Sequence, residues 1–346
     1  MQRARSILLP FSLLYGLGVS VRNLFFDIGI IKTTSAGVPV ISVGNISAGG
    51  TGKTPIVEML AARLKRAGKK PAVVSRGYRR TSTGYVLVSG GSGPCTDVRN
   101  AGDEAYQLAT DLNGVIVAVD ESRVRAAQNV VHSPGADRII LDDGFQHRYL
   151  HRDLNIVVVT ASEILKGEFL LPAGNRREPL SALKRSDIVI VTRWKDREEF
   201  DRAAMKLRRY GKPVAGARVE FSALRTMSTN QPLETSTLSG KRVVAFSGIG
   251  NPASFEELLS SSGALVEQYL VFRDHHWYSE NDIKNISDAR KRSNAAFVVT
   301  TEKDAARLHA ASGKFSESTP VVVARIRQNV TVGGELLNDL LRRFES

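Results

Sequence analysis

Eight residues near the amino terminus have the types and the spacing of a phosphate-binding loop. From residue 47 to residue 54 the chain reads SAGGTGKT, which matches the pattern G-x-x-x-x-G-K-[ST] except that serine replaces the first glycine. Glycines allow the tight turn that directs backbone amides at anionic oxygens, a lysine can reach the β- and γ-phosphates, and a threonine hydroxyl can bind Mg²⁺. The predicted nucleotide-binding residues are Ser47, Ala48, Gly49, Gly50, Thr51, Gly52, Lys53 and Thr54.

The sequence on either side of this loop supports the prediction. An apolar run, Val40–Val43, precedes the loop and a helical pattern, Thr54–Ala67, follows it. The amino-terminal end of such a helix adds the positive end of its dipole to the amides of the loop. A glycine-rich turn with an unrelated lysine is the alternative, and the strand–loop–helix order argues against it.

A pair of acids can complete a nucleotide site of this kind. The segment DRIILDDGFQH places Asp142 and Asp143 directly after an apolar strand, at the edge of a parallel sheet where ligands bind. We expect one of the two carboxylates, together with Thr54, to hold Mg²⁺. Taken alone, the pair could equally be an acidic turn. The nucleotide is predicted to be ATP, with GTP as the less favoured alternative, because the guanine-reading pattern N-K-x-D is absent and TTEKD at Thr300–Asp304 resembles it only distantly.

Short apolar runs alternate with longer helical patterns through the first 200 residues. This alternation predicts an α/β fold of the P-loop NTPase type, with a doubly wound, mostly parallel sheet and a second, smaller α/β domain. The predicted strands are Val40–Val43, Ala72–Val74, Val115–Val119, Arg138–Leu141, Asn155–Val159 and Asp187–Val191. The predicted helices are Thr54–Ala67, Glu104–Asp111 and Ser122–Val131.

A polar stretch rich in Ser and Thr, around residues 215–240, indicates a linker. We therefore expect three parts: an N-terminal segment over residues 1–30, the P-loop domain over 31–220, and a smaller α/β domain over 221–346. The smaller domain is expected to contribute to the active-site cleft.

The first 30 residues contain an uncharged stretch that arginines bracket. The stretch SILLPFSLLYGLGVSV has 16 residues, and a proline and two glycines interrupt it, whereas a spanning helix needs ~20 apolar residues. We interpret it as an interfacial segment that lies on a membrane, with arginines among anionic headgroups. A signal peptide and a buried hairpin that caps the core are the alternatives.

The net charge of +13 indicates an anionic partner, which could be a nucleic acid, an acidic lipid or a phosphorylated substrate. A merely basic surface is the alternative. Cys95 is the only cysteine, so an internal disulfide is excluded and a reducing cytoplasmic setting is favoured.

Three classes of ATP-binding protein fit these features: small-molecule or lipid kinases, partitioning or membrane-cycling ATPases, and nucleic-acid ATPases. The second class has a lysine two residues into the loop, where this chain has Ala48. The third is disfavoured because no basic motif is interleaved with aromatic residues, so no nucleic-acid partner is expected.

Motifs along the chain separate the remaining possibilities. They are GNISAGGTGKTP, RGYRR, GDE, DDGFQH, LPAGNRREPLSAL, DHH and TTEKDA. In this combination the chain resembles the tetraacyldisaccharide 4′-kinase (lipid A 4′-kinase) family, from the amino terminus to about residue 310. The resemblance implies transfer of the γ-phosphate of ATP to the 4′-hydroxyl of a tetraacyl glucosamine disaccharide 1-phosphate, which forms lipid IVA in lipid A biosynthesis. It also implies a peripheral position on the cytoplasmic face of the bacterial inner membrane, with the N-terminal segment as docking element and no protein partner.

The resemblance further implies roles for individual residues. Asp103 is the candidate general base, and His275 is its expected partner, which would hold or relay the proton. Asp103 could instead only cap the helix after it, and His275 could be a surface histidine. Candidate contacts to substrate or phosphate are Tyr78, Glu104, Arg123, His147 and Arg177. The family usually has an apolar residue where this chain has Arg176, so we take Arg177 as the arginine that faces the site.

Overall fold

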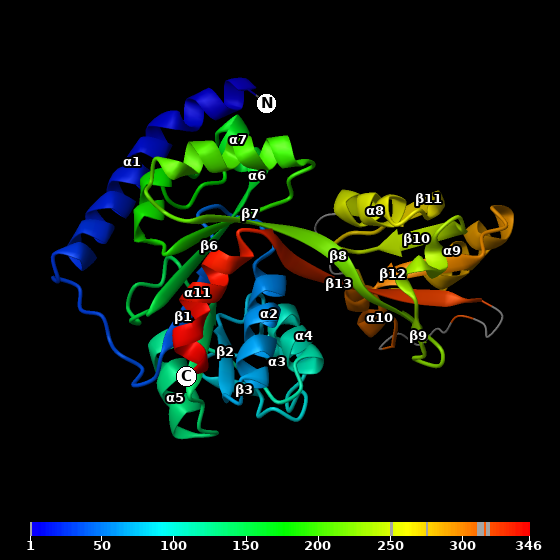
Figure 1. Ribbon diagram of the computed structural model, residues 1–346, viewed down its shortest axis with the longest axis horizontal. Helices are drawn as coiled ribbons and strands as arrows, with labels where there is room; N and C mark the ends of the chain where they lie inside the picture. The colour runs from blue at the N-terminus through cyan, green and yellow to red at the C-terminus, as the bar shows by residue number, and fades with distance from the viewer. Residues whose placement is uncertain (1, 250–251, 275, 310–314, 316–318) are drawn as a thin grey trace. The chain divides into compact units, whose positions relative to one another are not determined.

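The computed structural model describes residues 2–249, 252–274, 276–309, 315 and 319–346. The chain forms two compact units, the first of Met1–Arg218 with Val330–Ser346 and the second of Val219–Asn329 (Figure 1). It passes from the first unit to the second within strand β8 (Val214–Thr226) and returns within β13 (Val321–Val332).

The first unit is built on a mostly parallel sheet with strand order β8-β7-β6-β1-β5-β2-β4-β3. Each neighbouring pair is parallel except β3 with β4, which is antiparallel. The bounds are β1 Val40–Gly44, β2 Pro71–Ser75, β3 Val86–Ser89, β4 Ile116–Val119, β5 Arg138–Asp142, β6 Leu154–Thr160 and β7 Ile188–Thr192. The six predicted strands are therefore confirmed to within a residue or two.

Helices cover both faces of this sheet, because apolar residues on its strands alternate between two cores. Ile156 and Val158 of β6 pack in the core under α2, α4 and α11, whereas Val157 and Val159 pack under α6 and α7. Helix α5 covers the same second face further along the sheet. The bounds are α2 Lys53–Arg66, α3 Val98–Ala101, α4 Asp103–Asp111, α5 Arg123–His132, α6 Ala161–Lys166, η1 Leu180–Arg185, α7 Arg197–Arg208 and α11 Gly334–Glu345.

The N-terminal segment forms one helix, α1 (Gln2–Asp27), which continues through Pro10 and the two glycines. The sequence reading of these residues as interruptions was wrong, because contacts with the body hold the helix. The Ser12 hydroxyl donates to the Leu170 carbonyl at 2.9 Å. Gly16 leaves room for the Leu170 side chain, which a Cβ there would meet at 2.7 Å.

The outer face of α1 is apolar and exposed, so a buried hairpin is excluded. Residues 8–27 are long and apolar enough to cross a membrane by length and composition alone, and 11% of that window is buried. Large exposed apolar side chains along this helix and just after it are Phe11, Leu13, Leu14, Leu17, Val21, Leu24, Phe25, Ile28 and Ile30.

The second unit has a smaller parallel sheet with strand order β11-β10-β12-β13. Its elements are β9 Pro232–Leu233, η2 Thr235–Leu238, β10 Arg242–Ser247, α8 Pro252–Ser261, β11 Leu265–Val271, α9 Glu280–Arg292, β12 Phe297–Thr301 and α10 Glu302–His309. The prediction of a linker around residues 215–240 is wrong for most of that range. Strand β8 occupies its first half and β9 pairs with it, because Leu224 and Leu238 are fully buried despite the polar residues around them.

Candidate active site

The loop between β1 and α2 has the conformation that phosphate binding needs. Gly49 (φ 112°) and Gly52 (φ 87°) adopt backbone angles that other residues rarely adopt. In the part of the chain that the structure describes, the amides of residues 49–52 donate to no other group. The loop is therefore a set of unpaired donors at the start of α2, which suits an anion.

The start of this loop is fixed by the segment that follows β6 and α6. Ser47 is buried and its backbone pairs with that of Arg176, while the Ala48 amide donates to the Asn175 carbonyl at 2.7 Å. The serine that replaces glycine at the first position is thus held by an extended pairing, which requires no positive φ.

The two predicted acids lie beside the loop. Val43 of β1 is in register with Asp142, the last residue of β5, so both acids lie at the carboxyl end of a strand next to β1. Asp143 adopts a left-handed conformation (φ 53°), and its Oδ1 lies 3.4 Å from Lys53 Nζ. Its Oδ2 accepts a hydrogen bond of 2.8 Å from Arg177. Lys53, Asp143 and Arg177 therefore form one charged cluster next to the glycine amides.

The environments of the two acids differ. Asp142 is 3% exposed, and burial, followed by the charge of Glu104, raises the pKa of its carboxyl to about 7. Burial also acts against ionisation of Asp143, but the charges of Lys53 and Arg177 outweigh it and lower the pKa of Asp143. Asp143 is thus an ionised partner of two cations, whereas Asp142 forms no ion pair within the described ranges.

The donor set fits Mg²⁺ bound together with a nucleotide. The described residues include no group of three or more His, Cys, Asp or Glu side chains that could hold a metal by themselves. Mg²⁺ bound with a nucleotide needs fewer protein ligands, because phosphate oxygens and waters fill the other positions. Asp142 and Thr54 provide oxygen donors of the kind that Mg²⁺ binds. A nearby cation would stabilise the buried Asp142 carboxyl in its ionised form, and Thr54 lies on the first turn of α2.

Two further candidates, Asp103 and Glu104, lie at the start of α4. Gly102 (φ 82°) holds the N-cap position, so Asp103 is the first helical residue and the alternative role as N-cap is excluded. Gly102 packs closely on Tyr78, whose carbonyl a Cβ would meet at 2.9 Å. Tyr78 itself is exposed. Because the charge of Glu104 acts on Asp142, this helix start lies near the Asp142 carboxyl.

Arg123 and His147 lie in a strongly basic surrounding. Arg123 is 8% exposed at the start of α5, and its Nη1 donates to the Glu121 carbonyl. Burial, followed by the charges of nearby arginines, lowers the pKa of His147 to about 4, so this histidine is neutral at physiological pH. The arginines that act on it are Arg123, Arg152, Arg22 and Arg76.

The two neighbouring arginines of the LPAGNRREPL segment have different surroundings. Arg177 donates to Asp143, whereas Arg176 is buried and its Nη2 donates to the Glu163 carbonyl at 2.9 Å. Arg177 is therefore the one beside the loop.

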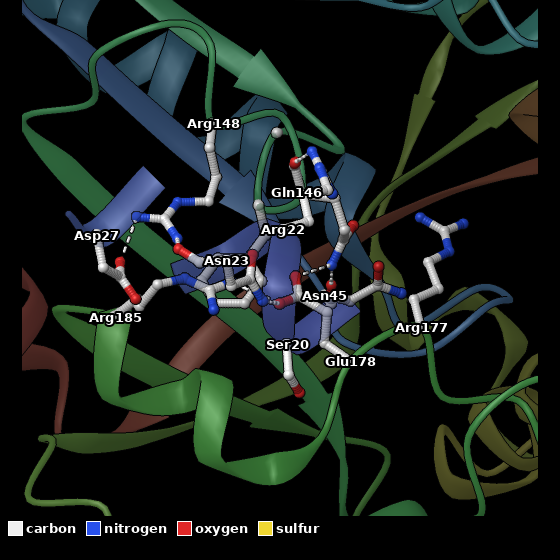
Figure 2. A network of polar contacts seen from close by, with 12 residues as sticks. Ser20, Arg22, Asn23, Asp27, Asn45, Gln146, Arg148, Arg177, Glu178 and Arg185 are labelled. Atoms are coloured by element: carbon white, nitrogen blue, oxygen red, sulfur yellow. Dashed lines mark hydrogen bonds and ion pairs between the residues drawn. The ribbon is translucent and has the colours of Figure 1, made fainter. Parts of the chain in front are cut away.

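A buried carboxylate that was not predicted from the sequence lies next to these arginines. Glu178 is 2% exposed; its Oε2 accepts from Asn23 of α1 at 2.9 Å and from Arg185 at 2.7 Å (Figure 2). Its Oε1 accepts from Gln146, which also donates to the Asn45 carbonyl at 2.8 Å. We call these five residues the Glu178 cluster. The only sequence signal is an acid in a basic, proline-containing segment after the fifth predicted strand.

His275 lies outside the described residues, so its predicted role stays a prediction. Its neighbour His276 has a structural contact, since its Nε2 lies 3.0 Å from Asp282 Oδ2 and its ring stacks on Phe272.

The chain matches a family model and known proteins over most of its length. A family model described as tetraacyldisaccharide-1-P 4′-kinase matches residues 4–345. The chain belongs to this family. It is 39% identical to the tetraacyldisaccharide 4′-kinase of Bdellovibrio bacteriovorus over 311 residues, which make up 88% of this chain and 89% of that one. It is 38% identical to the enzyme of Chlorobium limicola over 344 residues, 97% of either chain.

A solved member of the family has the same fold. The crystal structure of LpxK from Aquifex aeolicus in complex with ATP matches with a TM-score of 0.77 and 33% identity, over 99% of this chain and 100% of that one. Family membership confirms the predicted resemblance and the predicted α/β fold. It also confirms that the chain is a kinase that phosphorylates a tetraacyldisaccharide 1-phosphate at its 4′ position. The predicted roles of single residues stay predictions.

Proposed function

We propose that the chain transfers the γ-phosphate of ATP to the 4′-hydroxyl of a tetraacyl glucosamine disaccharide 1-phosphate, using the cluster of Lys53, Asp143 and Arg177. The observation that carries this proposal is the 3.4 Å contact between Lys53 Nζ and Asp143 Oδ1 beside unpaired loop amides. Phosphoryl transfer depends mostly on positioning and on neutralising charge. Two cations, an ionised carboxylate and a set of amide donors are suited to both.

In this proposal the loop amides bind the β-phosphate and Lys53 binds the β- and γ-phosphates. Arg177, which donates to Asp143 within this cluster, would contact the transferred group. Asp142 and Thr54 would hold Mg²⁺, which neutralises charge that develops on the phosphate oxygens. The structure of the A. aeolicus relative in complex with ATP supports the choice of nucleotide.

The acceptor hydroxyl needs a group that takes its proton. Asp103, at the start of the helix that lies near Asp142, is proposed as that base. His275 is proposed as its partner by family resemblance. The 4′-oxygen attacks the γ-phosphorus as the bond to the β-phosphate oxygen breaks. The proton passes to Asp103, and ADP leaves.

Helix α1 is the proposed membrane-docking element, on the cytoplasmic face of the inner membrane. Its exposed apolar face would enter the headgroup–acyl boundary, where the acyl chains of the substrate also lie. Its opposite face is attached to the body by the contacts of Ser12 and of the Glu178 cluster. The acceptor sugar would therefore be presented beside the loop.

A transfer assay tests this function. Purified protein with γ-labelled ATP and Mg²⁺ is offered the acylated disaccharide 1-phosphate, a plain sugar or DNA. We expect label on the lipid alone, loss of transfer in Lys53→Ala, and no change in the exposed control Lys284→Ala. ATP hydrolysis without any labelled lipid would contradict the proposal and favour one of the ATPase classes.

A further inference from the structure

The carboxyl end of β7 is attached to the phosphate loop from the side opposite to the two acids. The Thr192 hydroxyl, 1% exposed, donates to the Thr51 carbonyl of the loop at 2.8 Å. It also contacts the Val159 carbonyl of β6 at 3.2 Å. The residue that follows Thr192 is therefore held at a fixed place next to the loop.

That residue is Arg193, on whose guanidinium the charge of Glu163 acts. It makes no hydrogen bond and no ion pair within the described ranges, and it is exposed. Its Nη2 would lie 3.5 Å from a Cβ placed on Gly50, so the guanidinium lies over the loop. Its backbone is left-handed (φ 54°), a conformation that an arginine rarely adopts and that glycine would adopt freely.

The order of the strands gives the direction in which a bound nucleotide would run. Lys53 and Asp143, which would hold the γ-phosphate end, lie toward β5 on one side of β1. Strands β6 and β7 lie on the other side of β1 (Figure 1). The nucleoside end of the nucleotide therefore leaves the loop toward the end of β7, where Arg193 lies.

We propose that Arg193 is a nucleotide-binding residue whose guanidinium stacks on the purine base of ATP. This inference rests on the proposed function, because it takes the loop as the ATP site. A guanidinium is planar and weakly hydrated, and it stacks on aromatic faces. Since the stacking partner is the base, the contact strengthens binding of the whole nucleotide and contributes nothing to the transfer step itself.

The test compares ATP with inorganic tripolyphosphate, which has the phosphates and lacks the base. Binding to the full chain is measured with Mg²⁺ for wild type, Arg193→Ala, Arg193→Lys and Arg193→Gly. We expect the alanine and glycine variants to bind ATP about tenfold more weakly, the lysine variant to fall between, and tripolyphosphate binding to be unchanged. The glycine variant keeps the fold testable because φ 54° suits glycine.

Kinetics give a second readout. In the Arg193 variants the KM for ATP should rise about tenfold, while kcat at saturating ATP and the KM for the lipid stay at wild-type values. Arg202→Ala, which removes an exposed arginine of α7, is the matched control. Unchanged ATP affinity overturns the inference, and so does an equal loss for ATP and tripolyphosphate, which would make the contact one to phosphate. Failure of wild type to label the lipid, with ATP binding still lowered in Arg193→Ala, would count against the proposed function and leave the base contact standing.

Discussion

Removal of the Glu178 carboxylate tests whether α1 is held by the buried cluster in Figure 2. Glu178→Ala leaves Arg185, whose side chain is only 21% exposed, and two amide donors without their acceptor. Breaking a buried ion pair from one side costs about 3–5 kcal/mol of unfolding free energy. Asn23→Ala removes a single hydrogen bond to a charged group, for which we expect a cost of about 2 kcal/mol.

The two changes should not be additive, because the contact that Asn23→Ala removes is already lost in Glu178→Ala. The double variant should therefore cost about as much as Glu178→Ala alone, which is a coupling of about 2 kcal/mol. Urea unfolding is followed by the fluorescence of Trp194, 8% exposed in the first unit, after the other tryptophan is replaced by Trp277→Phe.

The matched control is Glu198→Ala. Glu198 and its partner Arg202 are 3.9 Å apart and largely exposed, so the change should cost less than about 0.5 kcal/mol. Additive costs in the double variant, or a cost below about 1 kcal/mol for Glu178→Ala, would refute the argument that this carboxylate holds α1.

Three further predictions follow from the site. Lys53→Ala or Asp103→Ala should abolish transfer to the lipid with unchanged circular dichroism, and normal turnover in either purified variant would contradict the assigned roles. Deletion of residues 1–21 should weaken sedimentation with anionic vesicles, and equal partitioning of the shortened chain would mean that α1 does not lie on the membrane. His147 has a folded-state pKa of about 4 against 6.5 in the unfolded chain, so the unfolded state binds the proton first as pH falls. This contribution to stability is thus fully present above pH 6.5 and is lost as pH falls toward 4. Unfolding of His147→Gln should lack this part of the pH dependence, and an identical profile in both proteins would contradict it.

The parts of the fold that could be predicted are those whose signal is local. Buried parallel strands consist of Val and Ile runs, as in Ile188–Thr192, because both faces of the sheet are covered. The phosphate loop was recognisable because its chemistry fixes residue types at adjacent positions. By contrast, the length of α1 depends on contacts with Leu170 and Arg177, about 160 residues away, which no local pattern reveals.

The return of the chain from the second unit to the first could also not be predicted from local sequence patterns. Helix α11 has apolar residues at helical spacing, Leu337, Leu341 and Phe344, which predict a buried face and do not say which core it joins. Its partners decide that question. Glu345 pairs with Arg63 of α2, and Arg138 donates to the Phe344 carbonyl.

The net positive charge of the chain includes arginines that lie beside the site. Two of them are Arg22 of α1, which donates to the Gln146 carbonyl, and Arg148, which donates to the Asn23 carbonyl and to Asp27 (Figure 2). Arg22 is also one of the four arginines whose charges, after burial, lower the pKa of His147. A nucleotide and a phosphorylated disaccharide are both strongly anionic, so such a field attracts the two substrates to one place. Because Arg22 both attaches α1 to the body and contributes to this field, loosening the helix would weaken substrate attraction and membrane docking together.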